Sequence, residues 1–257
     1  MDHLLDLTYR AEDRHFWFQG FRHFLTPVLA DVAGGRRDLR LLDCGCGTGA
    51  NLELLAPYGR AFGIDLSPGG LARAAQAGRS VARADVTRMP LPSESFDVVT
   101  SFDVLQCVPD DAGAVREMAR VARAGARLVV TMAALEVLSG DHGESWQEVR
   151  RYTPGGARAV MEQAGLRVDR VSFLFASLFP LMLGTRLAQR VSRPFRQVRD
   201  DSDISVPPGP VNEALAAVLR AEAAVSRRLP MPIGSSLLIV ARKSEVQRAR
   251  RAGRKTF

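Results

Sequence analysis

The sequence predicts a doubly wound α/β fold built on a mostly parallel sheet of seven strands. Three observations carry this expectation. From residue 39 to residue 132, short apolar runs typical of buried strands alternate with segments of helical periodicity. The loops between them are short, which favours right-handed βαβ crossovers. A loop with glycine at every second position, residues 45–49, directly follows the first strand.

The elements follow a regular order as far as residue 132 and a less regular one afterwards. Ser67 is expected to cap a helix with Pro68 at its first position, and Gly125 turns the chain into the fifth strand. The expected strands are residues 39–43, 61–65, 80–84, 96–101, 126–132, 166–173 and 235–241. We expect one domain over residues 1–242, with an N-terminal helical lid (1–36) and a helical insert or cap (176–232), followed by a basic disordered tail (243–257).

The composition is that of an ordinary globular protein, with 46% apolar and 25% charged residues. The formal net charge is +7, and residues 242–257 account for six of these charges. The basic character therefore belongs to the end of the chain and not to a nucleic-acid-binding face. We expect a solvated tail and no nucleic-acid partner, although contact of the tail with anionic lipid or nucleic acid stays open.

The cysteines and the apolar runs indicate the compartment. Cys44, Cys46 and Cys107 have no further Cys or His at zinc-ligand spacing, so we expect no metal and a reducing environment. No signal-peptide pattern opens the chain. The longest apolar run, residues 171–184, is shorter than the roughly 20 residues that span a bilayer. A cytoplasmic location is expected.

Two interpretations compete for the glycine-rich loop. Residues 45–50 fit a dinucleotide fingerprint, and Asp65 lies where a ribose-binding acid belongs. Asp43, at the end of the strand, instead suits an ammonium group, because a pyrophosphate gains nothing from a neighbouring carboxylate. Gly49 is one glycine more than the dinucleotide loop requires, and Asp85 adds a polar group after the third strand.

With these motifs the chain resembles the class I S-adenosylmethionine-dependent methyltransferases, specifically the small-molecule branch with the bacterial UbiE and type 11-like domains. Four ordered motifs carry the resemblance: LLDCGCGTG (41–49), GIDLSP (63–68), ADV with MPLP (84–92), and FDVV with FDVL (96–105). It covers residues 39–173 most clearly. The resemblance implies a Rossmann-like methyltransferase fold with an antiparallel last strand. It also implies S-adenosyl-L-methionine as cofactor and S-adenosyl-L-homocysteine as product.

The resemblance also implies roles for individual residues. The glycine-loop backbone would hold the methionine part of the cofactor, with Asp43 facing its amino group. Asp65 would accept from both ribose hydroxyls and Leu66 would pack on the adenine. Asp85 would accept from the adenine amino group, with Val86 lining the ring. The full expected cofactor set is Asp43, Gly45, Cys46, Gly47, Gly49, Asp65, Leu66, Asp85, Val86, Ser101, Phe102 and Arg22, and core packing is the alternative for Phe102.

The chain departs from the family after the fourth strand, where relatives commonly show Glu-His-Val and this chain has Gln106-Cys107-Val108. A glutamine and a thiol are poorer bases than histidine, which puts a base at that position in doubt. Methyl transfer mainly needs alignment of the reacting atoms. The catalytic candidates that remain are His142, Tyr152 and His15, for which a structural role is the alternative.

The expected acceptor side lies in the irregular parts of the chain. The substrate-binding candidates are Trp17, Phe18, Gln106 and Arg151. The aromatic segment 15–22 is expected to form either a lid over the glycine loop or a helix packed on the core. Arg151 is expected either to bind an anionic or planar substrate or to pair with a nearby acid. The insert 176–232 forms a pocket wall, a dimer face, a membrane-surface contact or part of an enlarged core.

The sequence therefore predicts a bacterial enzyme of secondary metabolism, a monomer or homodimer. It would move a methyl group to O, N or C of a small, apolar or aromatic metabolite. The alternatives are a non-catalytic partner subunit with the same fold and a membrane-surface methyltransferase acting on a lipid-like substrate. A nicotinamide-dependent oxidoreductase is disfavoured by Asp43 and the returning last strand.

Overall fold

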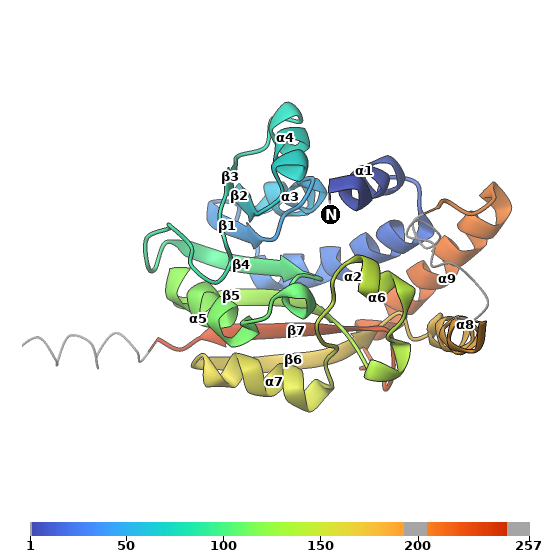
Figure 1. Cartoon of the computed structure of the whole chain (residues 1–257). Coiled ribbons are helices and arrows are strands. Elements are labelled where there is room, and N and C mark those ends of the chain that lie inside the picture. The colour runs from blue at the N-terminus through green and yellow to red at the C-terminus, as the bar shows by residue number, and fades with distance from the viewer. Residues whose placement is uncertain (1, 193–204, 246–257) are drawn as a thin grey trace, which may run out of the picture.

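A sheet of seven strands forms the middle of the molecule. The computed structural model describes residues 2–192 and 205–245 (Figure 1). The strand order is β3-β2-β1-β4-β5-β7-β6, and β7 pairs antiparallel with both of its neighbours while the other pairs are parallel. The strands are β1 (Leu39–Cys44), β2 (Gly59–Asp65), β3 (Val81–Arg83), β4 (Phe96–Phe102), β5 (Ala122–Ala133), β6 (Leu166–Leu174) and β7 (Ser236–Lys243). The expected sheet, with its antiparallel last strand, is confirmed.

The order of the strands reverses at β1. β2 and β3 lie on one side of β1, whereas β4 and β5 lie on the other. In open α/β sheets, ligands bind at the carboxyl edge beside such a reversal, because the flanking loops diverge there. β1 ends at Cys44 and β4 at Phe102, so the glycine-rich loop and the segment after Phe102 meet at this point.

Helices cover both faces of the sheet (Figure 1). Neighbouring strand residues serve opposite faces: Leu42 and Val130 pack with α5 and α7, whereas Leu41 and Val129 pack with α2, α3 and α9. Strands buried on both faces need continuous apolar runs, which is the pattern of this chain. The helices are α1 (Asp2–Ala11), α2 (Phe16–Ala33), α3 (Ala50–Leu55), α4 (Pro68–Gln76), α5 (Asp111–Val121), α6 (Asp141–Ser145), α7 (Pro154–Gln163), α8 (Phe179–Ser192) and α9 (Gly209–Ser226). Short 3₁₀ turns are η1 (Ala56–Tyr58), η2 (Leu105–Cys107) and η3 (Glu136–Leu138).

The two N-terminal helices lie against different parts of the molecule. α1 lies beside α4, where Asp6 forms an ion pair with Arg73 (Figure 1). α2 packs on α9 so closely that a Cβ at Gly20 would lie 2.4 Å from Leu219 Cδ1. Only glycine permits that approach, so this contact explains the glycine within the aromatic segment.

Asn212 of α9 fixes the start of α2. Its Oδ1 accepts from the backbone N–H of Phe16 at 2.8 Å, and its Nδ2 donates to the carbonyl of Arg14 at 2.8 Å. Glu222, further along α9, accepts from the backbone N–H groups of Ala176 and Ser177. The insert therefore supports both the N-terminal helices and the chain that leaves β6.

The boundaries differ from the expected ones at the end of the chain. Lys243, which the sequence assigns to the tail, is the last residue of β7, and its Nζ donates to the carbonyl of Ala122 at 2.8 Å. Most of the predicted tail, 246–257, and part of the insert, 193–204, lie outside the described residues. Within residues 2–192 and 205–245, no helix combines the length and apolarity needed to cross a membrane.

Candidate functional site

The glycine-rich loop connects β1 to α3 at the reversal point of the sheet. Its glycines at 45, 47 and 49 all have positive φ, of 81°, 52° and 82°. A Cβ added at Gly45 would lie 2.3 Å from Val104 Cγ2, so the loop lies directly against the segment that follows β4. The backbone N–H groups of Gly45 and Cys46 donate to the carbonyl of Ile64 at 2.8 and 2.9 Å. The loop is thereby fastened to the end of β2.

Asp43 presents a carboxylate oxygen without a partner. The residue has no solvent-exposed surface, and its Oδ1 accepts from Thr100 Oγ1 at 2.7 Å. Its buried Oδ2 has no hydrogen-bond partner among the described residues. Burial raises the pKa of Asp43 to about 6, assisted by the charge of Asp65 and opposed by the Thr100 bond. A buried acceptor of this kind calls for a donor such as an ammonium group.

Asp65 ends β2 and organises the turn beyond it. Its Oδ2 accepts from the N–H of Gly47 and its Oδ1 from the N–H of Ser67, each at 2.8 Å. Each carboxylate oxygen has lone pairs left for a further donor, such as a ribose hydroxyl. Leu66, the next residue, is 54% exposed, which leaves an apolar side chain for a flat ring to cover.

Asp85 lies beside an open depression of about 600 Å³ at the end of β3. Its Oδ1 accepts from the N–H and the Oγ1 of Thr87, and these two bonds hold the pKa of Asp85 below its ordinary value. The lining residues are Ala84, Asp85, Thr87, Arg88, Pro90 and Asp110. Val86 is buried among core residues and is not part of this lining.

Three further residues that were expected at the cofactor make different kinds of contact: Phe102, Ser101 and Arg22. Phe102 is buried and meets the ring of Phe21 edge to face, with centroids 5.7 Å apart. The buried hydroxyl of Ser101 has no hydrogen-bond partner among the described residues. Arg22 donates to the carbonyl of Glu12 at 2.7 Å and pairs with Asp13, so its guanidinium ties α2 to the chain that follows α1.

Glu12 contacts the glycine-rich loop, and the sequence did not predict this contact. Thr48 Oγ1 donates to Glu12 Oε2 at 2.9 Å, and the glutamate is 9% exposed. Burial raises the pKa of Glu12 to about 7, and the Thr48 bond opposes the shift. Leu5 of α1 lies close enough to make van der Waals contact with a Cβ placed at Gly47. No sequence pattern could predict these contacts, because they join α1 and the turn after it to a loop that lies about 36 residues further along the chain.

The side chains of the aromatic segment 15–22 pack partly in the core and partly against α1. Trp17 stacks on Phe175 with ring centroids 3.8 Å apart, on the α2 side of the sheet. Phe18 packs with Leu4 and Ala11. His15 is the N-cap of α2, its Nδ1 accepting from the Trp17 N–H at 3.1 Å. In the structure His15 therefore caps α2, and Trp17 packs against Phe175, which follows β6.

The acceptor-side candidates gather around the segment that follows β5. Gln106 Oε1 accepts from the Ala133 N–H at 3.4 Å, and its carbonyl accepts from the Val149 N–H at 2.8 Å. Arg151 pairs with Glu148 at 2.8 Å, with both side chains less than 10% exposed. His142 lies on the short α6, its ring 6.3 Å from that of Trp146.

Tyr152 is held by structural contacts. Its hydroxyl donates to Asp111 Oδ2 at 2.6 Å. Burial and this bond to the Asp111 carboxylate raise the pKa of Tyr152 well above its ordinary value. A phenol so placed stays protonated at neutral pH, which makes it a poor base.

Asp103, directly after β4, is a second acidic residue that the sequence-based candidates did not include. It has a positive φ of 55°, and burial raises its pKa to about 6. The sequence offered one signal, an acid directly after a strand at the carboxyl edge of the sheet.

Comparison with known proteins identifies the central part of the chain. Residues 42–130 match the family model described as "Methyltransferase domain". The chain contains a class I methyltransferase domain. The resemblance seen in the four sequence motifs is thus confirmed, and S-adenosylmethionine is the cofactor on which domains of this class depend. The match runs from the glycine-rich loop to β5 and leaves out α1, α2 and everything after β5.

Named relatives are similar to part of this chain. The chain is 35% identical over 113 residues to the malonyl-[acyl-carrier protein] O-methyltransferase of Serratia marcescens, covering 43% of this chain and 44% of the relative. It is 39% identical over 132 residues to the demethylmenaquinone methyltransferase of Roseiflexus sp. (strain RS-1), covering 47% and 54%. The chain thus spans about half the length of the curated relatives it matches.

A solved structure shares the fold over most of the chain. The S-adenosylmethionine-dependent methyltransferase from Mesorhizobium loti matches with a TM-score of 0.54 and 21% identity, covering 84% of this chain and 96% of that one. At this identity the likeness concerns the fold alone. The family model therefore covers the part of the chain that holds the glycine-rich loop, whereas the N-terminal helices and the chain after β5 lie outside it.

Proposed function

We propose that this chain transfers a methyl group from S-adenosylmethionine to O, N or C of a small, apolar or aromatic acceptor. The observation that carries the proposal is the buried Oδ2 of Asp43, which lacks a partner beside a loop of positive-φ glycines. The amino group of the cofactor would donate to this oxygen, while the ribose hydroxyls would donate to Asp65. Leu66 would cover the adenine and Asp85 would accept from its amino group.

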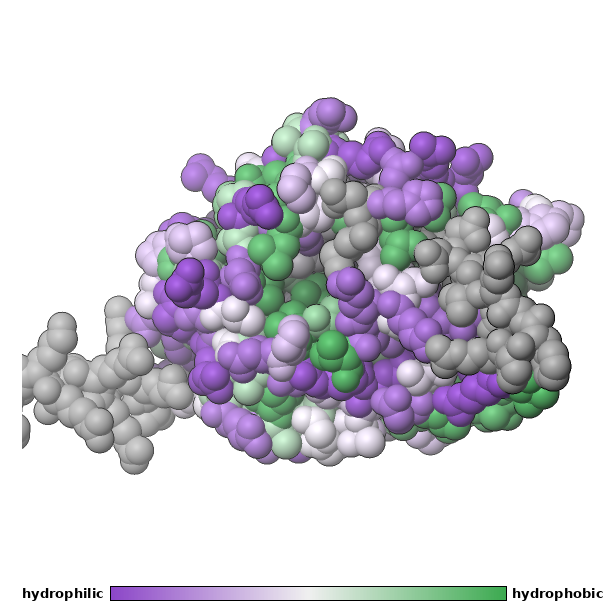
Figure 2. Space-filling view, in the orientation of Figure 1, coloured by the Kyte–Doolittle hydropathy of each residue, from purple (hydrophilic) through white to green (hydrophobic). Residues whose placement is uncertain are grey.

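The chain's own residues provide alignment and exclude water. When bound, S-adenosylmethionine supplies an activated methyl group on a sulfonium. Phe21 and Phe102, whose rings meet edge to face, would form an apolar wall beyond the glycine loop, and α1 contacts the loop through Leu5 while Glu12 bonds to Thr48. Such walls hold an acceptor in line with the methyl group and lower the local dielectric, which favours dispersal of the positive charge. Figure 2 shows apolar residues in the middle of the face seen in Figure 1, with polar residues around them.

The relatives act on chemically different acceptors, since their names include a malonyl-acyl carrier protein and a demethylmenaquinone. We therefore keep the acceptor class broad and propose a small molecule. Trp17, Phe18, Gln106 and Arg151 stay candidates for acceptor contacts on the evidence of their sequence positions, as does His142 for catalysis. The cytoplasmic location and the state as monomer or homodimer likewise stay predictions.

A membrane-surface variant of this function is supported by α8. Leu181, Leu187 and Val191 lie on this helix and are 61%, 48% and 77% exposed. An exposed apolar stripe on a helix that also carries arginines is typical of membrane-surface contact. Co-sedimentation with anionic liposomes tests this variant: the full chain pellets with them and Leu187→Glu does not. Equal recovery of both in the supernatant contradicts it.

Titration calorimetry tests the central proposal. S-adenosylmethionine should bind with micromolar affinity, and NAD should not bind under the same conditions. Incubation with radiolabelled S-adenosylmethionine and a panel of hydroxylated aromatics, amines and carboxylates should then transfer label to at least one acceptor. Tight binding of NAD without binding of S-adenosylmethionine would refute the proposal. Binding without transfer to any acceptor would instead favour the non-catalytic partner subunit.

A further inference from the structure

Asp103 is held in an unusual backbone conformation at the carboxyl edge of the sheet. It follows Phe102, the last residue of β4, and has a φ of 55°. Non-glycine residues rarely adopt this left-handed conformation, and they keep it only where the surroundings fix it. Here the Asp103 N–H donates to the carbonyl and to the Oγ1 of Thr131 on β5, at 3.1 and 3.0 Å. The fold thus holds this residue in a strained conformation that turns the chain just beyond the glycine-rich loop.

The two carboxylate oxygens of Asp103 have different surroundings. Thr131 Oγ1 donates to Oδ1 at 3.0 Å. Within residues 2–192 and 205–245, Oδ2 has no hydrogen-bond partner, and the residue keeps part of its surface exposed. One oxygen is therefore fixed and the other is open to a donor from outside the protein. A general base requires this arrangement, because its reactive atom must reach the proton that it removes.

The position of Asp103 relative to the proposed cofactor site is favourable. Val104, the next residue, lies against Gly45 of the glycine-rich loop. Phe102, the preceding residue, meets Phe21 edge to face. Asp103 therefore lies where the glycine-rich loop, the aromatic wall and the segment after β5 come together.

The charges around Asp103 come from several elements. Glu148 repels the ionised carboxylate, while Arg151 attracts it, and both belong to the chain between α6 and α7. Burial raises the pKa of the Cys107 thiol in η2, and the charges of Glu148 and Asp103 add to this shift. Burial outweighs the Thr131 bond and Arg151, and so raises the pKa of Asp103 to about 6. A carboxyl with that pKa is largely ionised at neutral pH and still basic enough to accept a proton.

We propose that Asp103 is the general base of this enzyme and that its substrate is the hydroxyl group of an aromatic acceptor. The inference rests on the proposed methyl transfer and deepens it. The acceptor O–H donates its proton to Oδ2 of Asp103. The electron pair freed on the acceptor oxygen forms the new bond to the methyl carbon, and the carbon–sulfur bonding pair remains on the sulfur as a neutral thioether. Asp103 thus fills the role left open by Gln106 and Cys107.

Three residues that were considered near this site, Tyr152, His15 and Gln106, are less suited to this role. The Tyr152 hydroxyl donates to Asp111, and the His15 imidazole caps α2. Gln106 has no basic atom. Phe102, directly before Asp103 in the chain, meets Phe21 edge to face, and an aromatic pair at this place favours an aromatic acceptor.

Asp103→Asn is the decisive variant. Asparagine keeps the size of the side chain, adopts the left-handed conformation readily, and can still accept from Thr131, so the variant should fold. With catechol as the acceptor probe, kcat should fall about 100-fold or more while KM changes little, as expected for a lost general base. In wild type kcat should rise with pH through about 6 and then level off, because the base works when ionised. The variant should lack this rise.

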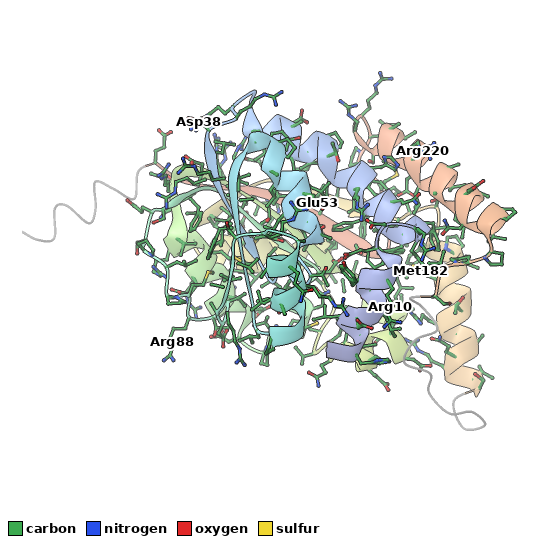
Figure 3. All side chains as sticks on the ribbon, turned by 90° about the horizontal axis from the view of Figure 1, so that it is seen from above. Arg10, Asp38, Glu53, Arg88, Met182 and Arg220 are labelled. Atoms are coloured by element: carbon green, nitrogen blue, oxygen red, sulfur yellow. The ribbon has the colours of Figure 1, made fainter. Side chains whose placement is uncertain are left out.

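The titration of the carboxyl itself gives a readout that does not depend on turnover. Protein labelled with ¹³C at the aspartate carboxyls, with S-adenosylhomocysteine added, should show a resonance that titrates near pH 6 and is absent from Asp103→Asn. The Asp43→Asn spectrum identifies the second resonance expected in that range. Asp38→Asn serves as the matched control, because Asp38 is exposed and lies at the end of the molecule opposite Arg10 and Met182 (Figure 3).

The results separate this inference from the proposed function. A kcat for Asp103→Asn within threefold of wild type, with the pH profile retained, overturns the base while methyl transfer stands. A carboxyl at position 103 that titrates near the ordinary aspartate range overturns it whether or not catechol is methylated. Failure of wild type to bind S-adenosylmethionine refutes the proposed function and, with it, the base.

Discussion

Three largely buried carboxylates surround the glycine-rich loop, and all three have raised pKa values. Asp43, Glu12 and Asp103 owe this shift first to burial, and each is opposed by one hydroxyl donor, from Thr100, Thr48 and Thr131 respectively. Burial of an ionised group costs free energy that a purely structural site would avoid. We expect these costs to mark positions where the fold is adapted to a ligand.

Asp43→Asn should weaken cofactor binding and stabilise the protein. The folded pKa of about 6 lies above the ordinary value of 3.8, so wild type loses stability as pH rises between these values. The amide removes that loss but is a poorer acceptor for an ammonium group. We expect at least tenfold weaker binding of S-adenosylmethionine by calorimetry and a higher Tm than wild type at pH 8. Unchanged affinity would argue against the assigned amino-group contact.

Glu12→Gln should change the pH dependence of stability. Because the pKa of Glu12 rises from 4.5 to about 7 on folding, its contribution to stability is lost as pH increases through that window. The amide can still accept from Thr48. Thermal unfolding at pH 5 and pH 8 should show a smaller fall in Tm for the variant than for wild type. Glu213→Gln, an exposed change on α9, should behave like wild type. Equal falls in Tm for wild type and Glu12→Gln would contradict the assigned effect of Glu12 on stability.

Among the elements, α9 does the most to position the N-terminal helices. It packs along α2, allows close approach at Gly20, and holds the start of α2 through Asn212. Because α2 carries Phe21, which meets Phe102 at the end of β4, we expect α9 to affect the proposed site through α2. The insert between β6 and β7 is thus part of the support for the site.

Asn212→Ala should loosen the N-terminal helices. It leaves the Phe16 N–H and the Arg14 carbonyl without their partners, at a cost of about 1–3 kcal/mol for such partly buried groups. Amide hydrogen exchange in residues 12–20 should accelerate, and exchange in β1 and β4 should not. Asn212→Asp keeps the acceptor but loses the donor, so its effect should be intermediate. The same exchange rates in all three proteins would show that α2 is held by packing alone.

The sequence predicted the elements that depend on local pattern and missed contacts that depend on folding. Alternating strands and helices located the sheet, and the motifs from Asp43 to Asp65 indicated the methyltransferase domain. The bond between Phe16 and Asn212 joins residues 196 positions apart, and no periodicity encodes it. Asp103 was overlooked because its raised pKa arises from burial in the fold, and its left-handed backbone is held by bonds to Thr131 on another strand.

For the whole molecule, ligand binding and folding are coupled. A ligand that binds only the folded state adds a stability of about RT ln(1 + [L]/Kd), roughly 2.7 kcal/mol at one hundred times Kd. Saturating S-adenosylmethionine should therefore raise the Tm by several degrees for a chain of this size. In Asp65→Ala, which loses the proposed ribose contact and the bond to the Gly47 N–H, affinity should fall at least tenfold. A wild-type shift in that variant, measured by scanning calorimetry, would contradict the ribose assignment.

The strand order also determines which strands can pair first while the chain is being synthesised. β7 is made after every other described strand, yet it lies between β5 and β6, and β7 is the only described strand with which β6 pairs. The core from β1 to β5 can assemble while the chain is still emerging from the ribosome, whereas β6 must wait for residues 236–243. α9 emerges only shortly before β7, so the N-terminal helices gain their Asn212 anchor about 200 residues after they themselves were made. The segments that surround the acceptor are therefore expected to be the last to reach their final arrangement.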